Sequence, residues 1–94
     1  METVCTREDE NSRYALTADG QLACVLEYQL SEEAISLVRT FTVPTFRGHG
    51  FANVLVSYAI EDIRDHSTRR VVPTCWYVGE WFEKHPEESA LLTR

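Results

Sequence analysis

A glycine-containing segment at residues 47–52 has the residue types of an anion-binding turn. Gly48 and Gly50 carry no Cβ, so the backbone can come very close to a bound group there. The segment opens a run with helical periodicity, and the first N–H groups of a helix lack intrahelical partners and attract negative charge. Arg47 and His49 add side-chain donors at the same place. We therefore predict that a phosphate or pyrophosphate binds at this helix start.

Two well-known phosphate-binding loops are excluded by the residues of this segment. A Walker A loop carries Lys and then Ser or Thr after its last glycine, whereas Phe51 and Ala52 follow Gly50. A dinucleotide-binding fingerprint needs a third glycine where Asn53 stands, and a parallel sheet before the turn. A turn that binds nothing remains the alternative at this point.

Cys75 is the second residue whose position could support chemistry. It follows residues 69–73, which are predicted to form a short buried strand, and comes at the start of a run with helical periodicity. The dipole at a helix start lowers the pKa of a thiol and makes the thiolate more available. A lone cysteine is also commonly a small buried hydrophobic residue, and the residues alone leave both interpretations open. Cys5 and Cys24 lack such a setting and are expected to be structural.

Three antiparallel strands are expected to lead into the glycine segment, because apolar residues alternate at residues 13–16, 22–28 and 34–43. Asp19-Gly20 is a hairpin-turn signal, and Pro44 ends the third strand because proline cannot donate to a sheet ladder. Residues 1–12 have few apolar anchors and are expected to be loosely held. The predicted buried faces are Leu22, Cys24, Leu26 and Tyr28 in the second strand, and Ile35, Leu37, Phe41 and Val43 in the third.

Beyond the glycine segment, the apolar spacing predicts an amphipathic helix from Gly50 to about His66. Residues 69–73 are then a short strand, which a right-handed crossover makes parallel to the third strand. A second helix is predicted at residues 75–84, followed by a short tail at residues 87–94. The result is a single α+β domain, a mixed α/β sandwich over residues 6–94. The inward residues are expected to be Phe51, Val54, Leu55, Tyr58, Ala59 and Ile63, and then Tyr77, Val78, Trp81 and Phe82.

The composition of the chain argues against several cellular compartments and several classes of partner. The 94 residues carry a net charge of −6, which argues against non-specific binding to nucleic acid. The three cysteines form no C-x-x-C pair, so we expect a reducing cytoplasm and no metal site. No apolar run approaches the roughly 20 residues of a membrane span, and the polar N-terminus has no signal-peptide core.

The pattern Arg47-x-x-Gly50-x-Ala52, between a strand and an amphipathic helix, resembles the acetyl-coenzyme A (acetyl-CoA) pyrophosphate loop of the GCN5-related N-acetyltransferases (GNAT). The resemblance runs from about residue 13 to residue 87 and implies a minimal GNAT-like fold, an antiparallel sheet with a central helix, a splayed strand pair and a short C-terminal helix. More narrowly, the chain resembles the small YjdJ-type acetyltransferases in Thr42-Val43-Pro44, Arg47-Gly48-His49-Gly50, Val72-Pro73-Thr74-Cys75 and His85-Pro86-Glu87.

The resemblance implies acetyl-CoA as cosubstrate and transfer of its acetyl group to an unidentified amine, which is a small amine, a polyamine or a protein lysine. By the same resemblance, the pyrophosphate is expected to lie on the N–H groups of residues 47–52, and the pantetheine arm in a splay between Phe41–Val43 and the Val71-Val72 strand. Cys75 is the implied catalytic residue, which either accepts the acetyl group or lines the thioester pocket. The implied cofactor-binding residues are Phe41, Thr42, Val43, Arg47, Gly48, His49, Gly50, Phe51 and Ala52.

Several residues are not given catalytic roles. The YjdJ-type subfamily often has a histidine where Thr40 stands, so no general base can be named. His85 is expected to cap a helix, and Arg69-Arg70 to be solvated rather than to meet the ribose phosphate of CoA. The aromatic residues near Cys75 are expected to form core and a groove wall. A CoA-binding module without catalysis and a protein-interaction domain that keeps the fold remain alternatives.

Overall fold

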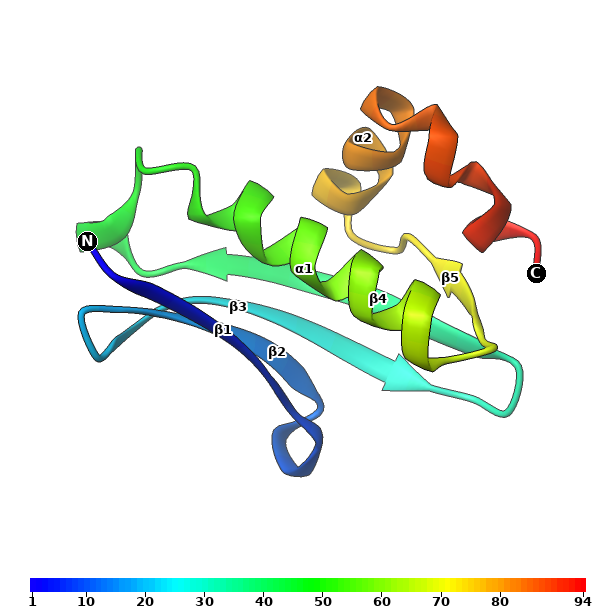
Figure 1. The fold of residues 1–94 in the computed structure, drawn as a ribbon, viewed down its shortest axis with the longest axis horizontal. Helices are drawn as coiled ribbons and strands as arrows, with labels where there is room; N and C mark the ends of the chain where they lie inside the picture. The colour runs from blue at the N-terminus through cyan, green and yellow to red at the C-terminus, as the bar shows by residue number, and fades with distance from the viewer.

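A five-stranded sheet, in the order β1-β2-β3-β4-β5, forms one layer, and helix α1 lies along one of its faces (Figure 1). The computed structural model describes residues 1–94. The first four strands are antiparallel and β5 is parallel to β4, so the expected α+β class and crossover are confirmed. The elements are β1 (Thr3–Glu8), η1 (Asp9–Asn11), β2 (Arg13–Ala18), β3 (Gln21–Leu30), β4 (Ala34–Thr42), η2 (Pro44–Phe46), α1 (Phe51–His66), β5 (Arg70–Val72), α2 (Trp76–Lys84) and η3 (Pro86–Leu92).

The apolar core lies between the sheet and the helices. α1 packs on β2, β3 and β4, while α2 and η3 cover its flank (Figure 1). Burying one large apolar side chain contributes about 1.5–3 kcal/mol, so this layer dominates the stability of the fold. The fully buried members include Tyr14, Leu16, Leu26, Leu37, Leu55, Val56, Ile60, Ile63, Val71 and Val78.

The buried face of α1 differs from the predicted one. Val54 and Tyr58 are 44% and 36% exposed, whereas Val56 and Ile60, which were not among the predicted inward residues, are buried. The reason is α2, which packs beside α1 and whose Trp81 Nε1 donates to Ser57 Oγ at 3.2 Å. The helix therefore buries an arc that faces both the sheet and α2.

The expectation that residues 1–12 are loosely held is wrong. β1 pairs with β2 along its whole length, from Thr3 opposite Ala18 to Glu8 opposite Arg13. The strand has few apolar anchors because backbone pairing and polar contacts hold it in place. Arg7 Nη1 lies 3.3 Å from Asp62 Oδ2 of α1, which links this edge strand to the helix.

A register irregularity between β3 and β4 corrects the predicted face of Phe41. Tyr28 lies opposite Leu37 whereas Glu27 lies opposite Arg39, so Val38 is an extra residue in β4. Such a bulge exchanges the two faces of a strand beyond it. Phe41 consequently lies on the face away from α1 and is 36% exposed, while the side chains of Thr40 and Thr42 turn toward the helix layer.

A second bulge corrects the predicted face of Leu22. Leu16 of β2 lies opposite Cys24, but the next residue, Thr17, lies opposite Leu22. Ala23 is the extra residue, so Leu22 turns away from the core and is 40% exposed. The turn itself is as predicted, because Asp19 and Gly20 both have positive φ, 49° and 81°, as a tight hairpin turn requires.

The C-terminal residues form more than a short tail. η3 spans Pro86–Leu92 and buries Leu91, which is 4% exposed. No helix in the chain combines the length and the apolar character that crossing a membrane requires.

Candidate active site

The segment between η2 and α1 has a row of unused backbone donors. Gly48 and Gly50 have φ values of 85° and 75°, in the left-handed region that strains other residues. The N–H groups of Gly48–Asn53 donate to no acceptor in the chain, and no side chain caps the start of α1. The N–H of Arg47 differs, because it donates to the Pro44 carbonyl at 3.3 Å. The geometry is that of an anion site at a helix N-terminus.

A groove leads from this segment toward Cys75. Two adjoining cavities of about 210 and 270 Å³ share Thr42, Arg47 and Ala52 in their walls, so we treat them as one feature, the β4 groove. One half is lined by Thr42, Phe46, Arg47, Gly48, Gly50, Phe51 and Ala52. The other half is lined by Thr40, Phe41, Thr42, Arg47, Ala52, Cys75, Trp76 and Tyr77.

The edge of β4 along the groove has no partner strand. β5 pairs only with Ala34–Ser36, and the Cys75 N–H then donates to the Leu37 carbonyl at 2.8 Å where the two strands part. The Val43 N–H donates to Ala23 of β3, so alternation along the antiparallel ladder directs the N–H and C=O groups of Thr40 and Thr42 away from β3. The predicted splay is therefore present, with backbone groups directed into it.

Cys75 is the N-cap of α2, as predicted, and its thiol is half-buried in the groove. Its Sγ lies 3.5 Å from Thr40 Oγ1. Burial raises the pKa of the Cys75 thiol, but hydrogen bonds from the Thr40 hydroxyl and from the backbone N–H groups of Tyr77, Val78 and Thr40 outweigh burial and lower it below its ordinary value. The net effect favours the thiolate, the reactive form of cysteine.

The other two cysteines have the opposite tendency. Burial is the main cause that raises the pKa of both the Cys24 and the Cys5 thiols. Cys24 packs in the core with its Sγ 3.4 Å from Thr42 Oγ1, and Cys5 packs against the same core. Their environments agree with the structural role expected of them.

Most of the predicted site residues meet at the groove. Phe41, Thr42, Arg47, Gly48, Gly50, Phe51, Ala52 and Cys75 all line it. Two do not. The exposed His49 side chain stacks on Phe51, with ring centroids 5.2 Å apart, and lines neither cavity. Val43 also lies outside the lining, and its N–H is used by β3.

Residues given no site role in the sequence also line the groove. Thr40 contacts the Cys75 thiol only because the bulge at Val38 turns its side chain inward. Trp76, which is 75% exposed, and Tyr77 form a wall beside Cys75, so the expected aromatic groove wall is present although Trp76 is not part of the core. The sequence could have indicated that Trp76 lines the groove, because it directly follows the N-cap cysteine.

No imidazole or carboxylate lines the groove. His85 caps α2, as expected, with Nδ1 2.7 Å from the Trp81 carbonyl and its ring stacked on that of Trp81 at 3.9 Å. Arg69 and Arg70 lie at the opposite end of α1 from the glycine segment (Figure 1). The Cys75 thiol is therefore the one group in the groove whose pKa is shifted toward its reactive form, since burial raises the pKa of the Tyr77 phenol beside it.

Comparison with known proteins identifies the family. No curated protein matches the chain. A family model described as GCN5-related N-acetyl-transferase matches residues 13–91, which include the sheet from β2 onward, the glycine segment, α1 and Cys75. Acetyl transfer is the general activity of that family, and the unused donors, open strand edge and thiol lie within the matched region. The chain belongs to the GCN5-related N-acetyltransferase family.

Proposed function

We propose that the protein binds acetyl-CoA in the β4 groove and transfers its acetyl group to an amine. One observation carries the proposal: a single groove connects the unused N–H groups of Gly48–Asn53 with the Cys75 thiol along the open edge of β4. The motifs at Val43-Pro44, Pro73-Thr74-Cys75 and His85-Pro86-Glu87 support placement among the small YjdJ-type acetyltransferases. The three free cysteines support a reducing, cytoplasmic setting.

The residues at one end of the groove fit a pyrophosphate. Unused backbone donors at a helix N-terminus bind phosphate oxygens without help from side chains. Arg47 has no acidic partner, so its charge is available to the same anion. Any side chain at Gly48 or Gly50 would strain the positive φ on which this backbone shape depends.

The middle of the groove fits an arm that contains amides. The outward C=O of Thr40 and the outward N–H and C=O of Thr42 can pair with amides as a neighbouring strand would, whereas the Thr40 N–H already donates to the Cys75 sulfur. Phe41 and Tyr77 supply apolar contact along the same path. This arrangement fits a pantetheine arm that points toward Cys75.

At the far end of the groove we propose Cys75 as the catalytic residue. Acetyl-CoA supplies an activated thioester. The Thr40 hydroxyl and the N-terminal N–H groups of α2 favour the thiolate form of Cys75. This thiolate attacks the thioester carbonyl, so that a thioester to Cys75 forms, the C–S bond to CoA breaks and CoA leaves as its thiolate. The acceptor amine then attacks the acetyl carbonyl, the amide forms and the Cys75 thiolate leaves. The proton lost by the amine passes through water to the released CoA thiolate, because the groove offers no imidazole or carboxylate.

Two measurements test the proposal. Calorimetry with acetyl-CoA tests binding, and absence of binding up to millimolar concentration would refute both transfer and a simple CoA-binding role. Release of free CoA thiol with small amines, polyamines and lysine peptides then tests catalysis. Binding without release in any of these reactions would leave a CoA-binding module.

The role of Cys75 has its own test. Brief exposure to acetyl-CoA without an amine should leave one acetyl group on Cys75, located by peptide mass spectrometry. Cys75→Ala should lose this acetylation and most of the turnover, whereas Cys5→Ala should retain both. Unchanged turnover in Cys75→Ala would show that the thiol only lines the pocket.

A further inference from the structure

The largest cavity in the molecule lies at the C-terminal end of α1, away from the β4 groove, and has a volume of about 490 Å³. No apolar residue lines it. Its wall is made by Arg7 of β1, Glu32 of the β3–β4 turn and residues 65–69, which run from the end of α1 toward β5. A cavity of this size suits a small molecule, and its lining suits a polar one.

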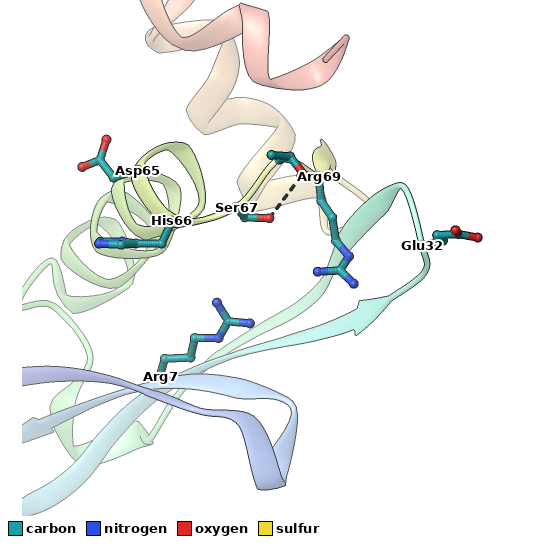
Figure 2. A pocket seen from close by; sticks show the side chains of 7 residues that line it. Arg7, Glu32, Asp65, His66, Ser67 and Arg69 are labelled. Atoms are coloured by element: carbon teal, nitrogen blue, oxygen red, sulfur yellow. Dashed lines mark hydrogen bonds between the residues drawn. The ribbon is translucent and has the colours of Figure 1, made fainter.

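Two guanidinium groups point into the cavity from opposite sides, one from Arg7 and one from Arg69 (Figure 2). Arg69 Nε donates to the Ser31 carbonyl at 2.7 Å, but its two terminal nitrogens have no acceptor in the chain. Arg69 is half-buried and, unlike its neighbour Arg70, has no acidic partner. A half-buried charge without a counter-charge is unfavourable, and an anion in the cavity would supply that counter-charge.

Two ion pairs fix the orientation of the Arg7 guanidinium at the other side of the cavity. Its Nε lies 2.5 Å from Asp9 Oδ1 and its Nη1 lies 3.3 Å from Asp62 Oδ2. These contacts orient the guanidinium plane and leave Nη2 without a partner. The two carboxylates also offset the positive charge of Arg7. Arg69 therefore supplies the positive charge in the cavity that no carboxylate offsets.

The segment between the two arginines adds donors to the cavity. The N–H and hydroxyl groups of Thr68 have no acceptor in the chain. Ser67 Oγ accepts from the Arg69 N–H at 3.1 Å, and its own hydrogen stays free. Of the two acids at the rim, Asp65 is paired with Arg64 at 3.0 Å, and the Glu32 side chain points away from the cavity (Figure 2).

The Arg94 guanidinium lies at the C-terminal end of α1 and covers two of the last four carbonyls of the helix, those of Ile63 and Arg64. The carbonyls of Asp65 and His66 have no donor in the chain. Arg94 Nη1 donates to the carbonyls of Ile63, Ser67 and Arg69, and its Nη2 donates to that of Arg64 at 2.8 Å. The positive charge of this guanidinium therefore offsets part of the negative end of the helix dipole.

We propose that this cavity, the Arg7–Arg69 cavity, binds a small molecule through a phosphate or carboxylate group. The oxyanion is held by the terminal nitrogens of Arg69, by Arg7 Nη2 and by the Thr68 N–H. The site is separate from the proposed acetyl-CoA groove, since the 16 residues of α1 span about 24 Å between the two ends. It therefore goes beyond the proposed transfer reaction.

The test is an NMR titration of the ¹⁵N-labelled protein with inorganic phosphate and, separately, succinate, at ionic strength held constant with sodium chloride. We expect saturable shifts of the Arg7, Ser67, Thr68 and Arg69 amides with at least one probe, and the stronger probe identifies the preferred oxyanion. Arg69→Gln should weaken that affinity about tenfold, as expected for one charge-assisted hydrogen bond. The matched control, Arg70→Gln, should leave the affinity unchanged.

The glycine segment could also bind phosphate, so the titration is repeated in an Arg47→Glu variant. Shifts at residues 66–69 that persist in this variant support the Arg7–Arg69 cavity independently of the acetyl-CoA proposal. Shifts confined to residues 48–53, or no saturable change with either probe, would overturn it. Equal weakening by Arg69→Gln and Arg70→Gln would also overturn it, because it would indicate general charge attraction.

Discussion

The two ends of α1 differ in whether the chain itself supplies hydrogen-bond partners for their backbone groups. At the N-terminal end, the N–H groups of Gly48–Asn53 have no acceptor. At the C-terminal end, Arg94 alone donates to four backbone carbonyls. An unsatisfied helix end costs stability unless water or a ligand fills it. The N-terminal end of α1 therefore keeps free donors that a ligand can use, whereas the Arg94 side chain covers part of the C-terminal end.

The largest effect should come from reversing the charge at the open end. Arg47→Glu should weaken acetyl-CoA binding about tenfold to a hundredfold, because it places a carboxylate beside the pyrophosphate. Calorimetry measures the affinity, and thermal unfolding should be nearly unchanged because Arg47 is exposed and unpaired. Equal affinity in variant and parent would mean that the glycine segment does not hold the cofactor.

A substitution at the C-terminal end of α1 should instead change the stability of the fold. Arg94→Ala should lower the free energy of unfolding by about 1–2 kcal/mol, because several carbonyls lose a charged donor. Lys84→Ala is the control: it removes an exposed pair with Glu80 at 3.1 Å and should cost less than about 0.5 kcal/mol. Urea denaturation measures both values. A loss of acetyl-CoA affinity in folded Arg94→Ala would contradict the division between the two ends.

A pair of glycine substitutions sharpens the comparison further. Gly50→Ala should cost about 1 kcal/mol of stability, because alanine is strained at φ 75° although its Cβ meets no atom within 4 Å. Gly79→Ala, inside α2 and equally free of clashes, should instead stabilise by about 0.5–1 kcal/mol. Denaturation midpoints for the two variants should therefore move in opposite directions. Shifts in the same direction would show that the Gly50 turn relaxes without cost.

The smallest expected effect concerns the pKa of the Cys75 thiol. Thr40→Val removes a hydroxyl that favours the thiolate, so the pKa should rise and the midpoint of alkylation against pH should move upward. The rate of iodoacetamide labelling at Cys75, followed by peptide mass spectrometry, measures this midpoint. Thr42→Val, which makes the same change beside Cys24, should leave the Cys75 profile in place. If the alkylation midpoint does not move in Thr40→Val, the backbone N–H donors alone account for the lowered pKa of Cys75.

Local patterns in the sequence were enough to predict the open end and much of the fold. The Gly48 and Gly50 turn and the N-cap position of Cys75 follow from residues close together in the chain, and the parallel β5 follows from the order strand, helix, strand. The contact between Thr40 and Cys75 could not be predicted, because it depends on one extra residue in the pairing of β4 with β3. Phe41 is apolar although it lies on the outer face, so the apolar alternation that begins at Ile35 and Leu37 continues past the bulge without a visible break.

Other features depend on partners far away in the sequence. β1 is held by pairing with β2 and by the contact between Arg7 and Asp62, which lie 55 positions apart. The role of Arg94 depends on carbonyls more than 20 positions earlier. Polar residues near a terminus are typical of a loose tail, and nothing local distinguishes these from residues that are held.

The order of the strands has a consequence for how the groove comes into being. Strand order in the sheet is the same as chain order, so the first four strands can pair as successive hairpins. Only the pairing of β5 with β4 requires closure of a long loop, which contains the whole of α1. Contacts of high sequence separation form more slowly than local ones. We expect the wall that carries Cys75 to dock late in folding, so a nascent or partly folded chain has the glycine segment before it has an assembled groove.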